Sequence, residues 1–508
     1  MIPLILLPFL LLFSSCFSLK IVSASVDDPE LCTRLTTAGQ DEIAALPGLT
    51  FQPNFKHYSG FLKTTSKHYF HYWFVTSQNK PCQDPLVFWF NGGPGCSSLA
   101  GLLDEMGPYL INSDGKSLRQ NPHSWNKNAS IVYIESPDGV GFSHSVDGGE
   151  PDASNDDSTA AQNYEAVKQF FNKFPLFRVN PTFITGESYA GVYVPMLVAK
   201  IVDGQTQFPI NLEGMAIGNG YMNAPLDTDT LARFAYGHGL VEEKEWQQIK
   251  KECCQGCLDT CDLGTQYGNC RQMVAKIVHF CWRGGLNVYD LYQNCAPHSS
   301  KLDIIRRGIY RTKSLHSNET ILWASDNANE FEGFENANGD KMQHLLRCLD
   351  GRPLVDYLNI PQVREALHIP TTVTAWDQCS DRVSRKYRVQ YSKRQAIRVN
   401  KKQFAFVADM SHFVWKALWA NVRVLLFYGD TDMACNFMLG QRFSEMLGLK
   451  RLSAKKPWHF DGQIAGFKTA YANGFTFITV RGSGHMVPQR RPAEIEYAFG
   501  HFLANRTI

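Results

Sequence analysis

This sequence has no large excess of positive or negative charge, no internal repeats and no low-complexity segments. Its 508 residues contain 50 lysines and arginines against 48 aspartates and glutamates, a formal net charge of +2. This balance provides no basic field of the kind that attracts nucleic acid, and no nucleic-acid-binding motif is present. After the first residues, no apolar run is long enough to span a bilayer.

The N-terminus does carry a long apolar segment. Residues 2–13 consist only of isoleucine, leucine, phenylalanine and proline, and small residues (serine, alanine and cysteine) recur among residues 14–25. The segment is shorter than a transmembrane helix and has the form of a signal-peptide core. We predict a signal peptide at residues 1–25. The usual preceding basic residue is missing, so an N-terminal membrane anchor is the alternative.

Fourteen cysteines indicate an oxidising compartment. Because the signal peptide would remove Cys16, an odd number remains and at least one thiol must stay unpaired. Sequons at Asn128, Asn318 and Asn505 are candidate sites for N-linked glycans. These features predict a protein of the secretory pathway, located in the lysosome or outside the cell.

Short apolar runs alternate with helical patterns along most of the chain. Residues 157–174, for example, place apolar side chains at helical spacing. This alternation predicts an α/β fold with a mostly parallel central sheet and helices on both faces. The predicted strands are 58–62, 69–75, 85–90, 130–135, 181–185, 422–428 and 475–480.

A cysteine-rich middle region interrupts the alternation. Residues 224–375 lack regular strand patterning, and we predict that they form a helical, disulfide-bonded cap above the C-terminal edge of the sheet. The core then consists of residues 26–223 and 376–508, a size that suits one large domain with an insertion.

Three of the predicted strands end at residues typical of a serine hydrolase. Ser188 lies just past the strand at 181–185. Asp430 and Asp432 lie past the next strand, and His485 lies past the last one. The order Ser, Asp, His at strand ends is that of the α/β-hydrolase fold. The histidine would act as general base and the aspartate would orient it, but the pattern does not choose between the two aspartates.

Small residues surround Ser188, as a sharp strand-to-helix turn requires. Gly186 and Ala190 flank it two positions away, and Ala190 departs from the strict G-x-S-x-G motif. Acyl transfer also needs backbone N–H groups that face the developing oxyanion. Tyr189 offers one such group, and the glycine-rich loop at 91–93 offers another.

Four longer motifs resemble the signatures of the serine carboxypeptidase family. They are NGGPGCSS at 91–98, ESPDGVGFS at 135–143, GESYAG at 186–191 and GHMVP at 484–488. The similarity extends over essentially the whole mature chain and is greatest to lysosomal, cathepsin A-like members. It implies an α/β-hydrolase that removes C-terminal residues from peptides or proteins without a metal or other cofactor.

The resemblance also implies roles for single residues. The catalytic triad would be Ser188, Asp432 and His485. The oxyanion donors would be the N–H groups of Gly93 and Tyr189. The residues implied to bind the substrate carboxylate are Asn91, Gly92, Glu105, Glu187 and, nearby, Trp89. Those implied to line the pocket of the departing residue are Cys435 and Met486.

Binding a carboxylate with carboxyl groups requires that protons be shared among them. A protonated Glu187 or Glu105 donates a hydrogen bond to the terminus of the peptide, whereas an ionised one repels it. We therefore expect activity to be highest at acidic pH. The alternative for Glu187 is a purely structural role beside the nucleophile.

The cysteine cluster at 253–261 can be read as zinc ligands or as disulfide partners, and disulfides fit a secreted chain better. Cys257 and Cys261 compete for Cys254, and Cys435 is the best candidate for a free thiol. The resemblance implies three disulfides, which are Cys96–Cys379, Cys253–Cys270 and Cys295–Cys348.

Processing and partners rest on the resemblance alone. It implies a homodimer, a cut of the precursor into two chains, and a stabilising partnership with lysosomal glycosidases. The basic segment at 306–313 is a candidate cleavage site, whereas the one at 382–402 is read as a solvated helix face. The alternative function is acyl transfer by the same triad. The intact set of Asn91, Glu105 and Glu187 favours peptides as substrates.

Overall fold

The computed structural model describes residue 32, residues 36–146, 153–295, 348, 351–387 and 409–508. The predicted signal peptide, the sequon at Asn318 and the candidate cleavage segment lie outside the described residues. Most of the basic segment at 382–402 lies outside them as well.

An eleven-stranded sheet forms the centre of the described structure, in the order β1-β2-β6-β3-β8-β9-β10-β13-β12-β11, with β7 paired to β2. The neighbours from β6 to β13 run parallel, and the outer strands on both sides run antiparallel. The strands are β1 (His57–Lys63), β2 (His68–Val75), β3 (Leu86–Phe90), β6 (Ser130–Ile134), β7 (His144–Ser145), β8 (Thr182–Glu187), β9 (Leu212–Gly218), β10 (Arg423–Gly429), β11 (Lys456–Phe460), β12 (Gln463–Ala470) and β13 (Phe475–Val480); β4 (Tyr109–Ile111) and β5 (Leu118–Gln120) form a separate pair.

The predicted α/β fold with a mostly parallel sheet is confirmed, and each predicted strand coincides with an observed one to within two residues. The sequence reading missed β9, which lies between the strands that carry the candidate nucleophile and acid. Its seven residues, LEGMAIG, include two glycines and a glutamate, so the apolar pattern typical of a buried strand is weak. The small side chains are required by close packing, because a Cβ at Gly218 would lie 2.5 Å from the ring of Phe427 on β10.

Helices cover both faces of the sheet because alternate side chains of the strands point in opposite directions. On β3, Phe88 joins one apolar layer, whereas Val87 and Trp89 join the other. The first layer packs against α2 (Asp156–Lys173), α3 (Ala190–Gly204), α12 (Ser411–Trp419) and α13 (Phe437–Met446). The second packs against α9 (Arg352–Leu358), α10 (Pro361–Ala366) and α15 (Pro492–Leu503).

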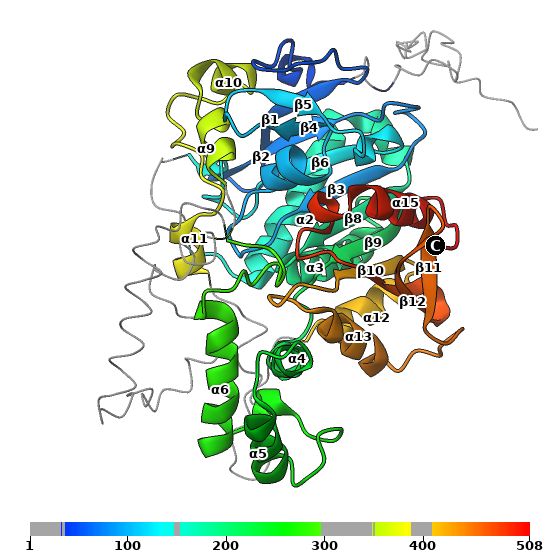
Figure 1. Cartoon of the computed structure of the whole chain (residues 1–508). Helices are drawn as coiled ribbons and strands as arrows, with labels where there is room; N and C mark the ends of the chain where they lie inside the picture. Colours follow the sequence, from blue (N-terminus) through cyan, green and yellow to red (C-terminus); the bar gives the residue numbers. More distant parts are fainter. Residues whose placement is uncertain (1–31, 33–35, 147–152, 296–347, 349–350, 388–408) are drawn as a thin grey trace, which may run out of the picture.

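The region predicted as a cap contains two different environments. The helices α4 (Ala224–Gly237), α5 (Glu243–Cys253) and α6 (Gly268–Arg283) build a small apolar cluster of their own. Figure 1 shows α5 and α6 projecting away from the sheet, with α4 nearer to it. This cluster includes Met433 and Ala434, which directly follow the candidate acid Asp432. By contrast, α9 and α10 lie near β1 and β2 and pack into the core of the sheet.

The structure contains the three disulfides that the resemblance implied, Cys96–Cys379, Cys253–Cys270 and Cys295–Cys348. It adds Cys32–Cys82, and it joins Cys254 to Cys261 rather than to Cys257. Among the described cysteines, Cys257, Cys281 and the expected Cys435 are unpaired.

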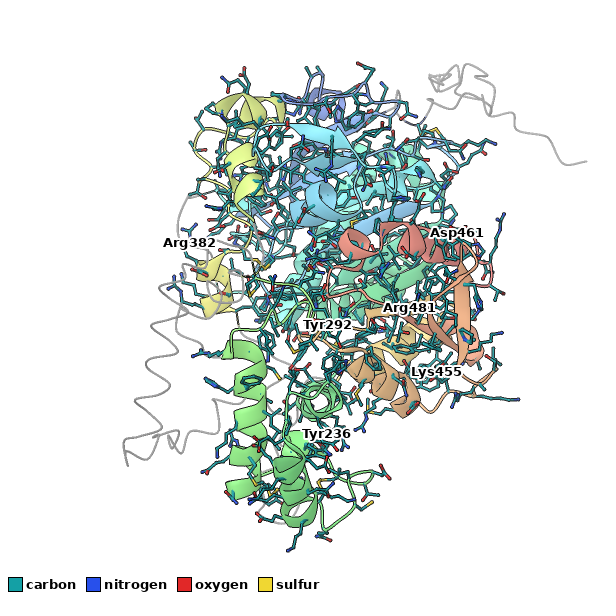
Figure 2. All side chains as sticks on the ribbon, viewed as in Figure 1. Tyr236, Tyr292, Arg382, Lys455, Asp461 and Arg481 are labelled. Atoms are coloured by element: carbon teal, nitrogen blue, oxygen red, sulfur yellow. A yellow bond between two sulfur atoms is a disulfide. The ribbon has the colours of Figure 1, made fainter. Side chains whose placement is uncertain are left out.

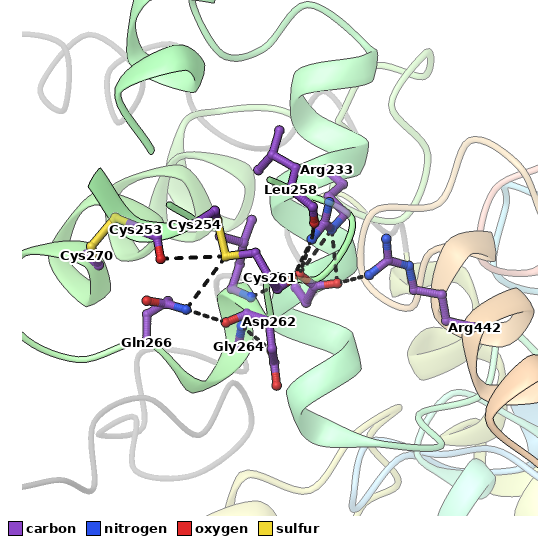
Figure 3. The surroundings of a disulfide bond; sticks show 12 residues. Arg233, Cys253, Cys254, Leu258, Cys261, Asp262, Gly264, Gln266, Cys270 and Arg442 are labelled. Atoms are coloured by element: carbon purple, nitrogen blue, oxygen red, sulfur yellow. Dashed lines mark hydrogen bonds and ion pairs between the residues drawn. A yellow bond between two sulfur atoms is a disulfide. The ribbon is translucent and has the colours of Figure 1, made fainter. Parts of the chain in front are cut away.

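The loop closed by Cys254–Cys261 is fastened to α4 (Figure 3). Arg233 of α4 donates hydrogen bonds to the carbonyls of Leu258 and Cys261, at 2.9 and 2.7 Å. The same arginine forms an ion pair with Asp229, at 3.0 Å. The cap is therefore held by polar contacts as well as by its disulfides.

Charged side chains such as Lys455, Asp461 and Arg481 point outward around the β11–β12 end of the molecule (Figure 2). None of the helices in the described part of the chain combines the length and apolar character needed to cross a bilayer.

Candidate functional site

The predicted nucleophile, acid and base lie at one edge of the sheet. Ser188 follows β8, Asp432 follows β10 and His485 follows β13, and these strands run parallel with β9 between β8 and β10. Because the carboxyl ends of parallel strands meet at the same edge, the topology places the three residues at one end of the sheet. Among the described hydrogen bonds, one joins His485 to Asp432 and none joins Ser188 to His485. The prediction from strand ends rested on this same geometry.

Ser188 occupies a tight turn between β8 and α3. Its φ is +63°, a left-handed conformation that costs a non-glycine residue of order 1–3 kcal/mol. The turn tolerates little bulk: a Cβ at Gly186 would lie 2.3 Å from the carbonyl oxygen of Phe90. Ala190 is accommodated, although its Cβ would lie only 2.6 Å from a Cβ at Gly186. Glycine is therefore required at 186, because a side chain there would collide with the backbone of Phe90 and also with Ala190.

His485 and Asp432 form a direct pair. The distance from His485 Nδ1 to Asp432 Oδ2 is 2.7 Å, and both side chains are buried. Asp432 Oδ2 also accepts from the N–H of Cys435 at 3.1 Å, and Oδ1 accepts from the N–H of Ala434 at 2.8 Å. These bonds hold the carboxylate in the orientation that fixes the imidazole ring of the base.

Asn219 is a site residue that the sequence reading missed. Its side-chain amide donates to Asp432 Oδ2 at 2.8 Å, and its side-chain oxygen accepts from the N–H of Gly429 at 2.9 Å. The preceding residue, Gly218, accepts the backbone N–H of Ser188 at 3.0 Å. The end of β9 therefore links the nucleophile to the acid. Recognition of β9 as a strand would have drawn attention to this asparagine.

Asp430 has a different task from Asp432. Its Oδ1 accepts the N–H of Gly482 at 2.6 Å and so ties the end of β10 to the turn that precedes His485. Burial raises the pKa of Asp430 above its ordinary value, and the hydrogen bond from Gly482 opposes that shift. Of the two aspartates that the pattern left open, only Asp432 contacts the imidazole among the described contacts.

The glycine-rich loop approaches the nucleophile closely. A Cβ at Gly92 would lie 2.3 Å from the backbone nitrogen of Tyr189 and 2.9 Å from the Cβ of Ser188. Gly93 follows with a φ of +114°. Only glycine permits this approach, so the N–H groups of Gly93 and Tyr189 can lie on either side of one reacting carbonyl.

The residues expected to bind a carboxylate form a buried polar cluster. The side-chain nitrogen of Asn91 donates to Glu187 Oε1 at 2.8 Å and lies 3.3 Å from Glu105 Oε1. Trp89 Nε1 donates to Asn91 Oδ1 at 2.7 Å and orients the amide. Because Glu187 directly precedes Ser188 in the chain, the cluster adjoins the nucleophile.

Both glutamates of this cluster favour the protonated state. Burial raises the pKa of Glu187 well above its ordinary value, and the neighbouring charge of Glu105 raises it further. Burial also raises the pKa of Glu105, whereas the hydrogen bond from Asn91 opposes the shift. Asn91 bridges the two carboxyl groups, because its side-chain nitrogen lies within 3.3 Å of an oxygen of each. A carboxyl pair that keeps a proton is suited to binding a third carboxylate.

The raised pKa values predict that stability depends on pH. The folded state holds protons on Glu105 and Glu187 at pH values where the unfolded chain has released them, so stability falls as pH rises through the raised pKa values. Compared with a Glu105→Gln/Glu187→Gln variant, the wild type should lose at least about 1.4 kcal/mol between pH 4 and pH 8. Denaturant unfolding of both proteins across this range measures the difference. Parallel curves would contradict the prediction.

The residues expected around the departing residue adjoin the triad. Cys435 is buried and donates its N–H to Asp432, and the partly exposed Met486 follows His485. Tyr289, to which the sequence reading gave no role, packs its ring 5.1 Å from that of His485 and accepts the backbone N–H of His485 at 2.7 Å. Burial and then the charge of Asp432 raise the pKa of Tyr289.

Two of the predicted glycan sites can be described. Asn128 and Asn505 are both exposed, as attachment of a glycan requires. Both lie outside the polar cluster and the triad.

Comparison with known proteins agrees with this geometry. Residues 47–505 match the family described as serine carboxypeptidase. The chain is 38% identical over 482 residues to the lysosomal protective protein of Mus musculus, covering 91% of this chain and 94% of the relative. It is 35% identical over 482 residues to serine carboxypeptidase ctsa-4.1 of Caenorhabditis elegans, covering 93% and 95%. The fold is similar to that of KEX1(delta)p, a prohormone-processing carboxypeptidase from Saccharomyces cerevisiae, with a TM-score of 0.67 at 22% identity and coverage of 93% and 97%.

Proposed function

Because the chain belongs to the serine carboxypeptidase family, we propose that it removes C-terminal residues from peptides and proteins at acidic pH through an acyl-enzyme on Ser188. The observation that carries the proposal is the hydrogen bond from Asn91 to Glu187, which adds a protonated carboxyl cluster to a Ser–His–Asp arrangement. A general serine hydrolase has no need of such a cluster.

In the proposed reaction, the Oγ of Ser188 attacks the carbonyl carbon of the last peptide bond while His485 takes the hydroxyl proton. The N–H groups of Gly93 and Tyr189 stabilise the oxyanion, each contributing about 3 kcal/mol. His485 then returns the proton to the departing amino group, and the C–N bond breaks. A water molecule, deprotonated by His485, hydrolyses the resulting ester and frees Ser188.

The carboxyl cluster gives the reaction its direction. A peptide whose terminal carboxylate accepts hydrogen bonds from Asn91 and from a protonated Glu187 or Glu105 presents its last peptide bond to Ser188. An internal segment of a protein has no carboxylate at that place and leaves the cluster unsatisfied. The site therefore selects chain ends.

The most direct test is a time course of peptide shortening followed by mass spectrometry. An N-blocked peptide of about ten residues should lose single residues from its C-terminus, in order, and yield no internal fragment. Cleavage at internal bonds, or no shortening by folded and fully processed protein, would contradict the proposal.

The affinity for substrate should depend on pH through the two glutamates. As the pH rises through about 8, the pKa of Glu105, the negative charge on the pair repels the substrate carboxylate, so KM should rise from neutral to alkaline pH. At the acidic end, binding weakens as the substrate carboxylate, with a pKa of about 3.5, becomes protonated.

A Glu105→Gln/Glu187→Gln variant measures this effect. Its KM should change less than about threefold from pH 5 to pH 9, against at least about tenfold for the wild type. Steady-state assays with benzyloxycarbonyl-Phe-Leu supply both values. A wild-type KM that stays flat across this range would refute the role of the carboxyl pair.

Acyl transfer is not favoured, because the carboxylate-binding set is complete. Adding an alcohol acceptor during turnover should leave the rate of amino acid release unchanged and give little ester product. Dominant ester formation would point to the alternative.

A second proposed role is stabilisation of lysosomal glycosidases. The similarity to a protein named lysosomal protective protein supports it, as it supports a lysosomal location over an extracellular one. Such a role does not need the nucleophile. A Ser188→Ala protein should therefore extend the half-life of a purified lysosomal glycosidase as well as the wild type does, and failure of both proteins to do so would remove this role.

The five disulfides in the described part of the chain fit a protein of the secretory pathway. We also propose that the protein forms a homodimer, for which sedimentation at micromolar concentration is the test.

A further inference from the structure

A buried aspartate lies behind the candidate oxyanion site, outside the triad and the carboxyl cluster. Asp156 is the first residue of α2 and is only 1% exposed. Its Oδ1 accepts the hydroxyl of Tyr189 at 2.9 Å and the hydroxyl of Tyr387 at 3.0 Å. The two tyrosines come from segments about 200 residues apart in the chain and meet on a single oxygen.

Of the two tyrosines, Tyr189 also takes part in the expected oxyanion site through its backbone. Its N–H is one of the two expected oxyanion donors, and it immediately follows Ser188, whose φ is +63°. A left-handed serine can relax if the next peptide rotates, and such a rotation would turn the Tyr189 N–H away from the oxyanion. The hydrogen bond to Asp156, at the far end of a fully buried side chain, opposes that rotation.

The second tyrosine connects Asp156 to the other oxyanion donor. Tyr387 follows α11 (Asp381–Lys386), and α11 is fastened to the glycine-rich loop. Ser380 donates its N–H to the carbonyl of Gly95 at 2.8 Å. Next to it, the disulfide Cys96–Cys379 joins the two segments covalently.

Further contacts make this connection stiff. The N–H of Ser97 donates to the carbonyl of Gln378 at 2.8 Å. A Cβ at Gly95 would lie 3.4 Å from the side chain of Val383, so α11 packs directly on the loop. The loop that carries Gly93 and the turn that carries Tyr189 are therefore linked through α11, Tyr387 and Asp156.

We propose that Asp156, together with Tyr387, is a positioning residue of the oxyanion site. It keeps the Tyr189 N–H directed at the same oxyanion as the N–H of Gly93. The inference rests on the proposed function, because it concerns the same reaction. It adds a group that touches neither the substrate nor the reacting atoms, and it gives the Cys96–Cys379 bridge a part in catalysis.

The chemistry of the cluster supports this role. Burial and the charge of Asp156 raise the pKa of Tyr189, and burial together with the charges of Tyr193 and Asp156 raises that of Tyr387. Both phenols therefore remain donors throughout the range of any assay. Two donated hydrogen bonds also spread the negative charge of Asp156, which would otherwise oppose a neighbouring oxyanion.

The test compares variants that differ in the ability to accept these two hydrogen bonds. Asp156→Ala removes the acceptor and should lower kcat about 10- to 100-fold with little change in KM, because the carboxylate-binding residues are untouched. Asp156→Asn keeps an acceptor oxygen and should recover kcat to within about threefold of wild type. A peptide aldehyde, which forms a tetrahedral adduct on the serine, should lose affinity in parallel with kcat.

If Asp156→Ala does not fold, variants that each remove one tyrosine hydroxyl still test the positioning role. Tyr189→Phe and Tyr387→Phe should each lower kcat about three- to tenfold at constant KM. The matched control is Tyr72→Phe on β2, which also removes a buried hydroxyl donated to a buried carboxylate, Asp41 at 2.8 Å. Neither residue is among the described contacts of the site. This variant should leave kcat unchanged.

The outcomes separate this inference from the proposed function. An inactive wild type would overturn the proposed function itself. An active wild type whose Tyr189→Phe and Tyr387→Phe variants match it in kcat would overturn the positioning role. Equal losses in Tyr72→Phe would overturn it too, since a general loss of packing would then explain the effect.

Discussion

Replacing Ser188 by alanine is expected to lower kcat for benzyloxycarbonyl-Phe-Leu by about a millionfold, because no other described group can form the acyl-enzyme. Binding should persist, since Asn91, Glu105 and Glu187 remain. Stability should also persist: alanine has the same Cβ as serine and suffers the same strain at a φ of +63°. Single-turnover assays together with equilibrium binding of the dipeptide measure the two effects.

Ser188→Gly supplies a control for the strain. Glycine adopts a positive φ without cost, so this variant should be equally inactive but more stable than wild type by about 1 kcal/mol. Activity retained in either variant would remove Ser188 from the mechanism. An unchanged stability in Ser188→Gly would show that the turn is not strained.

Replacing Asp432 by asparagine is expected to lower kcat about ten-thousandfold. Asp432 Oδ2 accepts from His485, Asn219 and the N–H of Cys435, and an amide nitrogen at that position would face three donors. The imidazole would lose both its orientation and the compensation of its positive charge. Steady-state kinetics near the pH optimum, with unfolding monitored in parallel, measures the loss.

The matched control is Asp430→Asn. This residue has the same type and lies two positions earlier, but it accepts only backbone N–H groups around Gly482. Its replacement should lower kcat less than about tenfold and should mainly affect stability. Comparable losses in both variants would mean that the acid of the triad is misassigned.

The strands and their ends were predictable because the relevant signals are local. A run of apolar residues that stops at a glycine or polar residue indicates a buried parallel strand, and the proposed catalytic residues Ser188, Asp432 and His485 follow such runs. The choice of Asp432 over Asp430 was not local. The resemblance implied Asp432, and in the structure it is Asp432 whose carboxylate faces an imidazole 53 residues further along the chain.

Other features had no local signal at all. The role of Asn219 depends on β9, whose glycines are needed for close packing and conceal the strand pattern. The hydrogen bond between Asp156 and Tyr387 joins residues 231 positions apart, and no sequence pattern near either residue predicts it.

The location of α9 and α10 also could not be predicted from their own sequences. Their short amphipathic patterns suit either a cap or the core, and only the assembled sheet shows that they pack into the core.

We propose that the enzyme recognises a free terminal carboxylate through protonated glutamates beside Ser188. The most direct test is the ratio of kcat/KM for benzyloxycarbonyl-Phe-Leu to that for its C-terminal amide, measured at pH 5 and pH 9. We expect a ratio of at least about a hundred at pH 5 that shrinks at pH 9, because the pKa of Glu105 is about 8 and the carboxyl pair loses protons above it. Equal cleavage of the acid and the amide at acidic pH would contradict it.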